Sequence, residues 1–266
     1  MLGSVKRNSL LLILKWLGIV LAIVALASPV ITQEYSNSKR HGRDIVLVID
    51  SSESMIQEGF DETNLSKNKF SVVKEVASDF VDKRQNDRIG LVTFADIAFV
   101  ASPLTFERKF LQQIIALQRL GVAGKRTAIN DALVHAYSML ESSNVKSKVV
   151  ILLTDGIDNA SEIGEDEVKS LVAKSNVKLY TIGIGNREDF NEAYLQRLAK
   201  AGKGEFFSAK NAKELSKIYE KINALETSKI DDKKIVQHTY MFVYPLLISF
   251  FSFIFFIYFR TIKGLL

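Results

Sequence analysis

The chain of 266 residues contains no cysteine. This absence excludes disulfide bonds, thiol nucleophiles and metal sites built on thiolates. Histidine is nearly as scarce, and His41, His135 and His238 lie far apart in the sequence. His135 falls off the apolar face of its expected helix, so the pattern favours a surface histidine over a general base. Carboxylates and hydroxyls remain as the main candidates for chemistry.

Three common catalytic or nucleotide-binding patterns are also incomplete. Gly124 and Lys125 resemble the end of a phosphate-binding loop, but Arg119 stands where that pattern requires glycine. The pair Gly183 and Gly185 lacks the third glycine of a dinucleotide fingerprint, because Glu188 occupies its place. A G-x-S-x-G nucleophile elbow does not occur in the sequence.

Acidic residues are missing from both ends of the chain. Residues 1–31 and 241–266 contain no Asp or Glu, and their basic residues are Lys6, Arg7, Lys15, Arg260 and Lys263. These basic residues account for the whole formal net charge of +5, so residues 32–240 are neutral overall. The positive balance therefore gives no argument for nucleic-acid binding.

Both ends are apolar enough to suggest membrane spans. The segment 10–31 has 22 residues interrupted by Lys15, whose stem can snorkel to the headgroups, and 240–259 has 20 residues without a charge. The alternative for the first segment is a cleaved signal peptide ending at Ala25-Leu26-Ala27. We expect an uncleaved anchor, because the apolar stretch is long for a signal core.

The basic residues lie outside both predicted spans, which places both termini in the cytoplasm and the intervening chain on the far side. In a bacterium, this is a two-pass protein of the inner membrane with its central part in the periplasm or at the exterior. The expected division is an N-terminal anchor at 1–31, a tether at 32–43, a central domain at 44–227, a linker at 228–239, a C-terminal span at 240–259 and a cytoplasmic tail at 260–266.

Residues 44–227 alternate short apolar runs with helical patterns. Strands are expected at 44–50, 89–94, 149–154, 177–183 and 204–207, with a short edge strand at 98–100 that Pro103 closes. Helices are expected near 70–81, at 107–118, from Thr127 onward, and at 164–175, 189–200 and 211–226. This alternation predicts an α/β fold, a doubly wound, mostly parallel, Rossmann-like sheet.

Oxygen-bearing side chains follow the strand that begins at Asp44. Asp50 ends this strand, and Ser52 and Ser54 follow at alternate positions. A turn at the carboxyl end of a central strand can direct all three toward one point, where ligands of open α/β sheets bind. One carboxylate and two hydroxyls form a hard, oxygen-only site suited to Mg²⁺. The alternative is that these residues only turn the chain and cap the next helix.

Two further residues can join this site from other parts of the sequence. Asp155 ends another buried strand, and the carboxyl ends of such strands meet at the switch point of a doubly wound sheet. Thr127 can offer a third hydroxyl from a neighbouring loop. Each also has a purely structural alternative, since Thr127 can be a helix N-cap and Asp155-Gly156 a simple turn.

The motifs D-x-S-x-S at 50–54, R-T-A-I-N-D-A-L at 126–133 and L-L-T-D-G at 152–156 together resemble the von Willebrand factor A domain. The resemblance implies a metal-ion-dependent adhesion site in which Ser52 and Ser54 bind Mg²⁺ (alternatively Mn²⁺ or Ca²⁺) directly. Asp50, Thr127 and Asp155 bind the ion directly or through water, and an acidic side chain of a protein partner completes the coordination. Glu53 and Arg126 stand where relatives commonly have glycine.

The junction A-L-A-S-P at 25–29, D-R-I-G-L-V-T-F at 87–94 and S-P-L-T at 102–105 resemble the bacterial aerotolerance (Bat-type, BatA-like) membrane proteins. This resemblance implies assembly with sister von Willebrand factor A membrane proteins and a role in envelope or oxidative-stress tolerance. It also suggests a MoxR-type AAA+ ATPase as a partner. Glu53, Lys125 and Arg126 are candidate partner-binding residues beside the site.

Three classes of function remain after this reading. We favour a protein-interaction module that is not an enzyme. A Mg²⁺-dependent hydrolase or phosphatase is one alternative, because a metal with an open position can polarise a phosphate. A metal-independent structural scaffold is the other. If Asp50 and Asp155 repel each other, replacing Asp155 with alanine is expected to stabilise the metal-free fold slightly.

Overall fold

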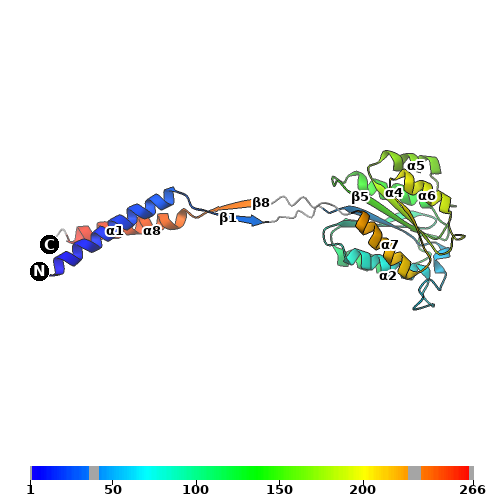
Figure 1. Ribbon diagram of the computed structural model, residues 1–266, viewed down its shortest axis with the longest axis horizontal. Helices are drawn as coiled ribbons and strands as arrows, with labels where there is room; N and C mark the ends of the chain where they lie inside the picture. The colour runs from blue at the N-terminus through cyan, green and yellow to red at the C-terminus, as the bar shows by residue number, and fades with distance from the viewer. Residues whose placement is uncertain (1, 36–41, 227–234, 264–266) are drawn as a thin grey trace. The chain divides into compact units, whose positions relative to one another are not determined.

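The structure is a computed structural model that describes residues 2–35, 42–226 and 235–263. The chain divides into two compact units (Figure 1). One unit combines the two ends of the chain, Met1–Lys39 and Asp231–Leu266. The other, which we call the central unit, is formed by Arg40–Ile230.

The central unit contains a six-stranded sheet with the strand order β4-β3-β2-β5-β6-β7. Its strands are β2 (Asp44–Asp50), β3 (Arg88–Phe94), β4 (Ala98–Thr105), β5 (Lys148–Thr154), β6 (Lys178–Ile184) and β7 (Phe206–Ala209). All neighbouring strands pair in parallel except β3 and β4, which are antiparallel. Every residue of β2 is buried, as expected for a central strand covered on both faces.

Helices cover both faces of this sheet. They are α2 (Lys69–Asp82), α3 (Arg108–Leu117), α4 (Ile129–Glu141), α5 (Glu165–Lys174), α6 (Glu192–Ala201) and α7 (Ala212–Leu225). Figure 1 shows α2 and α7 on one face and α4, α5 and α6 on the other. Because side chains alternate along a strand, Leu47 packs into the core under α2, α3 and α7, whereas Val46 and Val48 pack under α4, α5 and α6.

The predicted doubly wound α/β fold is confirmed, and the buried strands begin and end within about two residues of their predicted positions. The edge strand differs, because β4 continues through Pro103 to Thr105 instead of ending before it. A proline is tolerated there because an edge strand has one side without ladder hydrogen bonds, and the register shifts near Leu91 loosen the pairing.

Two helix starts also differ from the prediction. Helix α4 begins at Ile129, so Thr127 belongs to the preceding loop and Ala128, not Thr127, is the N-cap residue. Helix α6 begins at Glu192, after an Asn191 side chain that accepts a hydrogen bond from Tyr194 N. Asp189, expected at the start of that helix, therefore lies in the loop between β6 and α6.

The terminal unit consists of two helices and a two-stranded ribbon. Helix α1 (Leu2–Leu26) packs against α8 (Val243–Lys263), and β1 (Val30–Tyr35) pairs antiparallel with β8 (Ile235–Tyr240), as Figure 1 shows. The buried Ser249 and Ser252 of α8 donate hydrogen bonds from Oγ to the carbonyls of Gly18 (2.7 Å) and Leu14 (2.8 Å). Small and hydroxyl-bearing residues thus lie between the helices, as in helix pairs within membranes.

The helices and strands of the terminal unit begin and end at other residues than the segments predicted for the two apolar ends. The helix in the predicted 10–31 segment ends at Leu26, and a strand begins at Val30 after Pro29. Parts of the expected tether and linker form the β1–β8 ribbon, and Tyr240 ends β8 instead of starting a span. Among the described residues, only Val243–Ile262 is a helix both long and apolar enough to cross a bilayer, whereas the apolar part of α1, Leu11–Leu26, is shorter.

Candidate metal centre

The loop after β2 gathers three of the predicted oxygen ligands. Asp50 is fully buried at the end of β2, and its Oδ1 accepts a hydrogen bond from the backbone N–H of Ser52 at 2.8 Å. The Oγ atoms of Ser52 and Ser54 are 3.0 Å apart. Ser51 holds the start of the loop by donating hydrogen bonds from its N–H and Oγ to the carbonyl of Phe94 on β3. The two serines are therefore brought to one side of a fixed turn.

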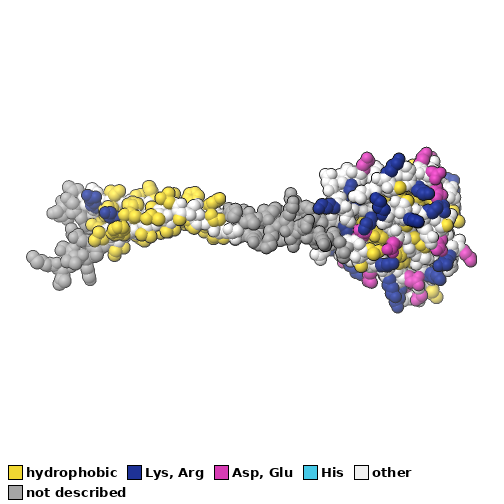
Figure 2. Space-filling model, turned by 45° about the horizontal axis from the view of Figure 1, so that its top comes forward, with side chains coloured by type: hydrophobic (Ala, Val, Ile, Leu, Met, Phe, Trp, Pro, Cys, Tyr) yellow, Lys and Arg dark blue, Asp and Glu magenta, His cyan; other side chains and the backbone are white. Residues whose placement is uncertain are grey.

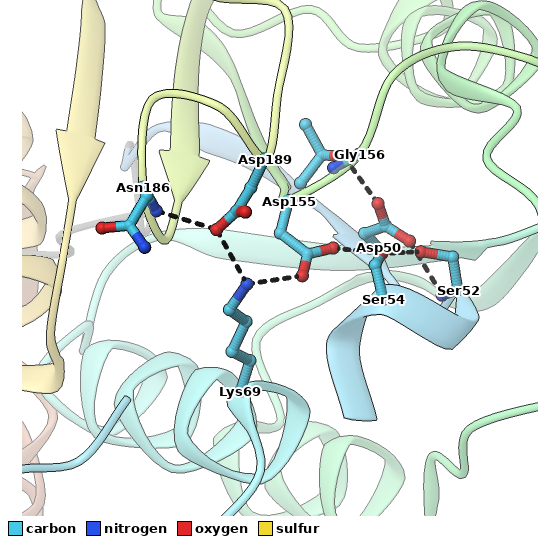
Figure 3. A network of polar contacts seen from close by, with 9 residues as sticks. Asp50, Ser52, Ser54, Lys69, Asp155, Gly156, Asn186 and Asp189 are labelled. Carbon is cyan, nitrogen blue, oxygen red and sulfur yellow. Dashed lines mark hydrogen bonds and ion pairs between the residues drawn. The ribbon is translucent and has the colours of Figure 1, made fainter. Parts of the chain in front are cut away.

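Asp155 reaches the same place from β5, the strand beside β2. Ser54 Oγ donates a hydrogen bond to Asp155 Oδ1 at 2.5 Å. Thr154 Oγ1 donates one to Asp50 Oδ2 at 2.6 Å, and Gly156 N–H donates one to Thr154 Oγ1 at 3.1 Å. Figure 3 shows Asp50, Ser52, Ser54 and Asp155 lying together beside the ends of the two strands. The structure thus brings Asp50, Ser52, Ser54 and Asp155 together.

Thr127 lies against the turn that follows Asp155. A Cβ atom placed on Gly156 would come within 2.7 Å of Thr127 Oγ1, so this glycine leaves room for the threonine side chain. The backbone of Thr127 is fixed by Asn159, whose Oδ1 accepts from Thr127 N–H (2.9 Å) and whose N–H donates to the Thr127 carbonyl (3.0 Å). The loop before α4 therefore places Thr127 against Gly156, the residue that follows Asp155.

Burial controls the charge of the two carboxyl groups. It raises the pKa of Asp50 from 3.8 to about 7, although hydrogen bonds from Ser52 and Thr154 act in the opposite direction. Burial also raises the pKa of Asp155, against the hydrogen bond from Ser54 and the positive charge of Lys69. A cation bound between these groups would favour their ionised forms.

Lys69 is part of the network, and our sequence analysis missed it. It is the first residue of α2 and is only 4% exposed, and its Nζ is 3.0 Å from Asp155 Oδ2 and 3.3 Å from Asp189 Oδ2 (Figure 3). A sequence signal existed, because Lys69 precedes the buried Val73 by four residues and so shares its inward face. Thr154 and Asp189 were missed as well. Thr154 is the last residue of a predicted strand and carries no further signal, and no local pattern distinguishes Asp189.

The three predicted partner-binding residues lie exposed at the rim of this site. Lys125 Nζ is 3.3 Å from Glu53 Oε1, and Glu53 N–H donates to the Lys125 carbonyl at 2.9 Å. Arg126 Nε is 3.4 Å from Asp96 Oδ1. Asp96 Oδ1 also accepts hydrogen bonds from the N–H groups of Lys125 and Arg126, which hold the pKa of Asp96 below its ordinary value. Each basic side chain of the rim thus has an acidic partner that offsets its field.

The donor atoms fit a hard divalent cation. The side chains that meet here offer carboxylate and hydroxyl oxygens, the ligand types that Mg²⁺, Mn²⁺ and Ca²⁺ prefer. Within residues 2–35, 42–226 and 235–263, no three His, Asp or Glu side chains form a metal-binding group. An ion at this place would therefore be held by two carboxylates together with hydroxyl and water oxygens.

Two bacterial proteins share substantial sequence with the chain. An uncharacterized protein of Borreliella burgdorferi is 33% identical over 217 residues, which cover 82% of this chain and 62% of that protein. YwmC of Bacillus subtilis, also uncharacterized, is 34% identical over 116 residues, which cover 42% of this chain and 48% of that protein. The chain thus spans less than two thirds of the length of either relative.

Solved structures share the fold of the central unit. BatB from Bacteroides thetaiotaomicron is 22% identical with a TM-score of 0.59, and the match covers 70% of this chain and 100% of that one. Proximal thread matrix protein 1 from the mussel byssus, solved with zinc in its metal-ion-dependent adhesion site, is 27% identical with a TM-score of 0.58. That match covers 74% of this chain and 48% of the mussel protein.

A sequence model of the von Willebrand factor type A domain matches residues 44–221, which include the whole sheet and every residue of the predicted metal site. The order of the strands and the single antiparallel edge agree with that match. The chain belongs to the von Willebrand factor type A domain family.

Proposed function

We propose that this chain is a membrane-anchored protein-interaction module whose von Willebrand factor type A domain binds Mg²⁺ and, through it, an acidic side chain of a partner protein. Domains of this family generally mediate metal-dependent protein interactions. The observation that carries the proposal is the hydrogen-bonded cluster of Asp50, Ser52, Ser54 and Asp155 at the ends of β2 and β5.

In the proposed site, Ser52 and Ser54 bind the ion directly, and Asp50, Thr127 and Asp155 bind it directly or through water. When bound, the ion supplies positive charge and a coordination position that a carboxylate can fill. Asp50 orients the serine loop by accepting the Ser52 N–H, and Thr154 holds the second oxygen of Asp50. Two carboxylates balance the divalent charge, and a partner carboxylate would bind by replacing a water molecule at the remaining coordination position.

Mg²⁺ is the proposed ion, with Mn²⁺ or Ca²⁺ as alternatives. The mussel protein holds zinc in its adhesion site. In this chain the candidate ligands are all oxygens, which Mg²⁺, Mn²⁺ and Ca²⁺ prefer, whereas zinc favours nitrogen and sulfur.

The partner is proposed to contact the rim formed by Glu53, Lys125 and Arg126 while its carboxylate reaches the ion. Lys125 and Glu53 are 74% and 58% exposed at their side chains, so their ion pair is screened by solvent. Rim charges of this kind change the rate of association more than the affinity.

We also propose that the apolar ends form two membrane spans, with both termini in the cytoplasm and residues 32–239 in the periplasm or at the exterior. The apolar helix Val243–Ile262 and the packing of α1 against α8 support this arrangement. The likeness to Bat-type proteins supports sister von Willebrand factor A membrane proteins as partners and a role in envelope or oxidative-stress tolerance. A MoxR-type ATPase is the partner proposed on the cytoplasmic side. The proposed function is binding and not catalysis.

The test is capture of partners by the tagged full chain from detergent-solubilised membranes, in Mg²⁺ and in chelator. Proteins retained in Mg²⁺ and released by chelator are the expected partners. The double variant Ser52→Ala with Ser54→Ala is expected to lose them, because it removes both hydroxyl ligands but little buried volume. A matched control, Ser138→Ala with Ser216→Ala, changes two exposed serines on α4 and α7 and is expected to retain them.

Circular dichroism checks that both double variants keep their secondary structure. Equal capture by the folded Ser52 and Ser54 variant would overturn the metal bridge. It would favour a metal-independent scaffold, in which the hydrogen bonds of Asp50 and Asp155 serve only to hold the loops.

A further inference from the structure

A buried lysine lies beside the proposed metal site and is shared between two carboxylates. Lys69 Nζ is 3.0 Å from Asp155 Oδ2 and 3.3 Å from Asp189 Oδ2, while the other oxygen of Asp155 accepts from Ser54. The Lys69 side chain is 5% exposed and that of Asp155 fully buried, so water screens their attraction little. One carboxylate oxygen of Asp155 thus faces the serines, and the other faces a fixed positive charge.

The surroundings hold Lys69 in this position. Its backbone N–H donates to the carbonyl of Gln57, which follows the serine loop, at 2.8 Å. On the other side, Asn186 N–H donates to Asp189 Oδ2 at 2.8 Å and fixes that carboxylate. Gly185 has a φ of +102°, and a Cβ atom there would lie 2.4 Å from Asp189 Oδ2 and 2.8 Å from Lys69 Nζ. The β6–α6 loop therefore leaves space for the pair.

The charge of Lys69 suggests that this residue affects metal binding as well as packing. A positive charge next to Asp155 offsets part of the negative charge that this carboxylate offers to a second cation. Asp189 counteracts that effect, because its carboxylate also pairs with the ammonium group of Lys69 and neutralises part of its charge. The attraction of the site for a metal ion thus depends on how the charge of Lys69 is divided between Asp155 and Asp189.

We propose that Lys69 is a positioning residue that lowers the metal affinity of the site by acting as its built-in counter-cation, and that Asp189 limits this effect. This inference rests on the proposed metal site. Lys69 keeps the metal-free network compact and leaves a bound ion with less negative charge around it. A less neutralised ion attracts a partner carboxylate more strongly. Lys69 thus lowers the affinity of the site for the metal ion and raises the affinity of the metal-bound site for the partner.

The test measures Mn²⁺ binding to the full chain in detergent by electron paramagnetic resonance of the free ion at pH 8, with Mg²⁺ as competitor. Lys69→Met keeps the length of the side chain but removes its charge, so Mn²⁺ is expected to bind more tightly by on the order of ten-fold. Asp189→Asn leaves Asp155 as the only carboxylate paired with Lys69, so Mn²⁺ is expected to bind several-fold more weakly. Lys69→Arg restores the charge and is expected to return the affinity toward that of the unmodified chain.

The counter-cation role predicts that Lys69→Met and Asp189→Asn change the Mn²⁺ affinity in opposite directions. A merely structural role predicts that both variants disturb the site and weaken Mn²⁺ binding. The matched control is Lys67→Met, which removes the charge of a partly exposed lysine paired with Glu75 and is expected to leave the affinity unchanged. Ser52→Ala with Ser54→Ala shows whether the measured Mn²⁺ occupies the proposed site.

The inference and the proposed function fail in different ways. If the serine variant binds Mn²⁺ as well as the unmodified chain, or if the unmodified chain binds none, the metal site itself is wrong. If binding depends on the serines but Lys69→Met binds equally or more weakly, the counter-cation role is overturned. Should Lys69→Met fail to fold by circular dichroism, Lys69→Gln, which also removes the charge, takes its place, and equal or weaker Mn²⁺ binding by that variant contradicts the inference.

Discussion

Asp155 is the residue on which the network converges, since it accepts from Ser54 through one oxygen and pairs with Lys69 through the other. From the sequence alone, repulsion between Asp50 and Asp155 is the main effect to expect. The structure changes this expectation, because the buried ammonium group of Lys69 lies 3.0 Å from Asp155 Oδ2 and attracts this carboxylate. The loss of Asp155 therefore leaves a buried positive charge with Asp189 as its remaining carboxylate partner.

We accordingly predict that Asp155→Ala lowers the free energy of unfolding of the metal-free protein by about 3 kcal/mol, the low end for a broken buried ion pair. Chemical denaturation in chelator measures this change. In the double variant with Lys69→Met the buried charge is also gone, so the loss is expected to be smaller than the sum of the single losses. Stabilisation by Asp155→Ala would instead show that repulsion from Asp50 dominates.

The raised pKa of Asp50 predicts a pH dependence. In the folded, metal-free protein this carboxyl group keeps its proton up to about pH 7, whereas the unfolded chain loses it near 3.8. Its contribution to folding stability is thus fully present below about pH 4 and is lost as the pH rises to about 7. A metal ion that binds below pH 7 must release this proton, so metal affinity is expected to rise with pH and level off above 7.

Calorimetry of Mn²⁺ binding in two buffers with different ionisation enthalpies counts the released protons. We expect about one proton at pH 6 and far fewer at pH 8. Release of far less than one proton at pH 6 would mean that Asp50 is already ionised in the folded, metal-free protein.

The residues of the site differ in how far the sequence predicts them. Asp50, Ser52, Ser54 and Asp155 directly end or follow apolar runs, and neighbouring parallel strands bring such ends together. Asp189 gives no such signal, because it acts through a contact with Lys69 that is 120 residues away in sequence. Short-range sequence patterns predict which face of a helix or strand a residue occupies. They do not predict which charged residue, distant in the sequence, it contacts.

At the scale of elements, the buried strands were predicted well because a run such as Ile45–Ile49 has few alternatives to a central strand. The ribbon of β1 and β8 was not predicted. Each strand mixes polar and apolar residues, and each acquires its conformation from a partner about 200 residues away. The stability of such a pair depends on contacts between the strands, which no local pattern reveals.

The register of this ribbon can be tested because the chain lacks cysteine. Ile31 lies directly opposite Thr239. Directly opposed residues have Cα atoms about 4.5–5.5 Å apart, within the range of a disulfide. We predict that cysteines introduced at these two positions cross-link under mild oxidation, visible as a mobility shift that a reductant reverses.

The control pair places cysteines at Ile31 and Gln237, two residues out of register. Diagonal positions are about 7–8 Å apart, so this pair is expected to cross-link far less. Efficient cross-linking of the control together with none at Ile31 and Thr239 would show a different register.

At the scale of the whole molecule, the alternation of strands and helices was sufficient to predict the fold class. The family match and the strand order bear it out. The membrane arrangement follows from different physics, namely apolar length and the position of basic residues. Only α8 meets the length and composition of a span among the described residues, so the two-pass arrangement remains a prediction.

The last prediction tests this arrangement. Basic residues flank the outer ends of both apolar segments, and such residues are retained in the cytoplasm. A single cysteine at Ser138, an exposed position on α4, is therefore expected to react with a membrane-impermeant maleimide on intact spheroplasts. A single cysteine at Gly264, outside the described residues, is expected to react only after permeabilisation. Because the natural chain has no cysteine, every label on it reports the introduced position. Labelling at position 264 together with protection at position 138 would show the reverse orientation. Labelling of both positions on intact spheroplasts would show that the chain does not cross the membrane between them.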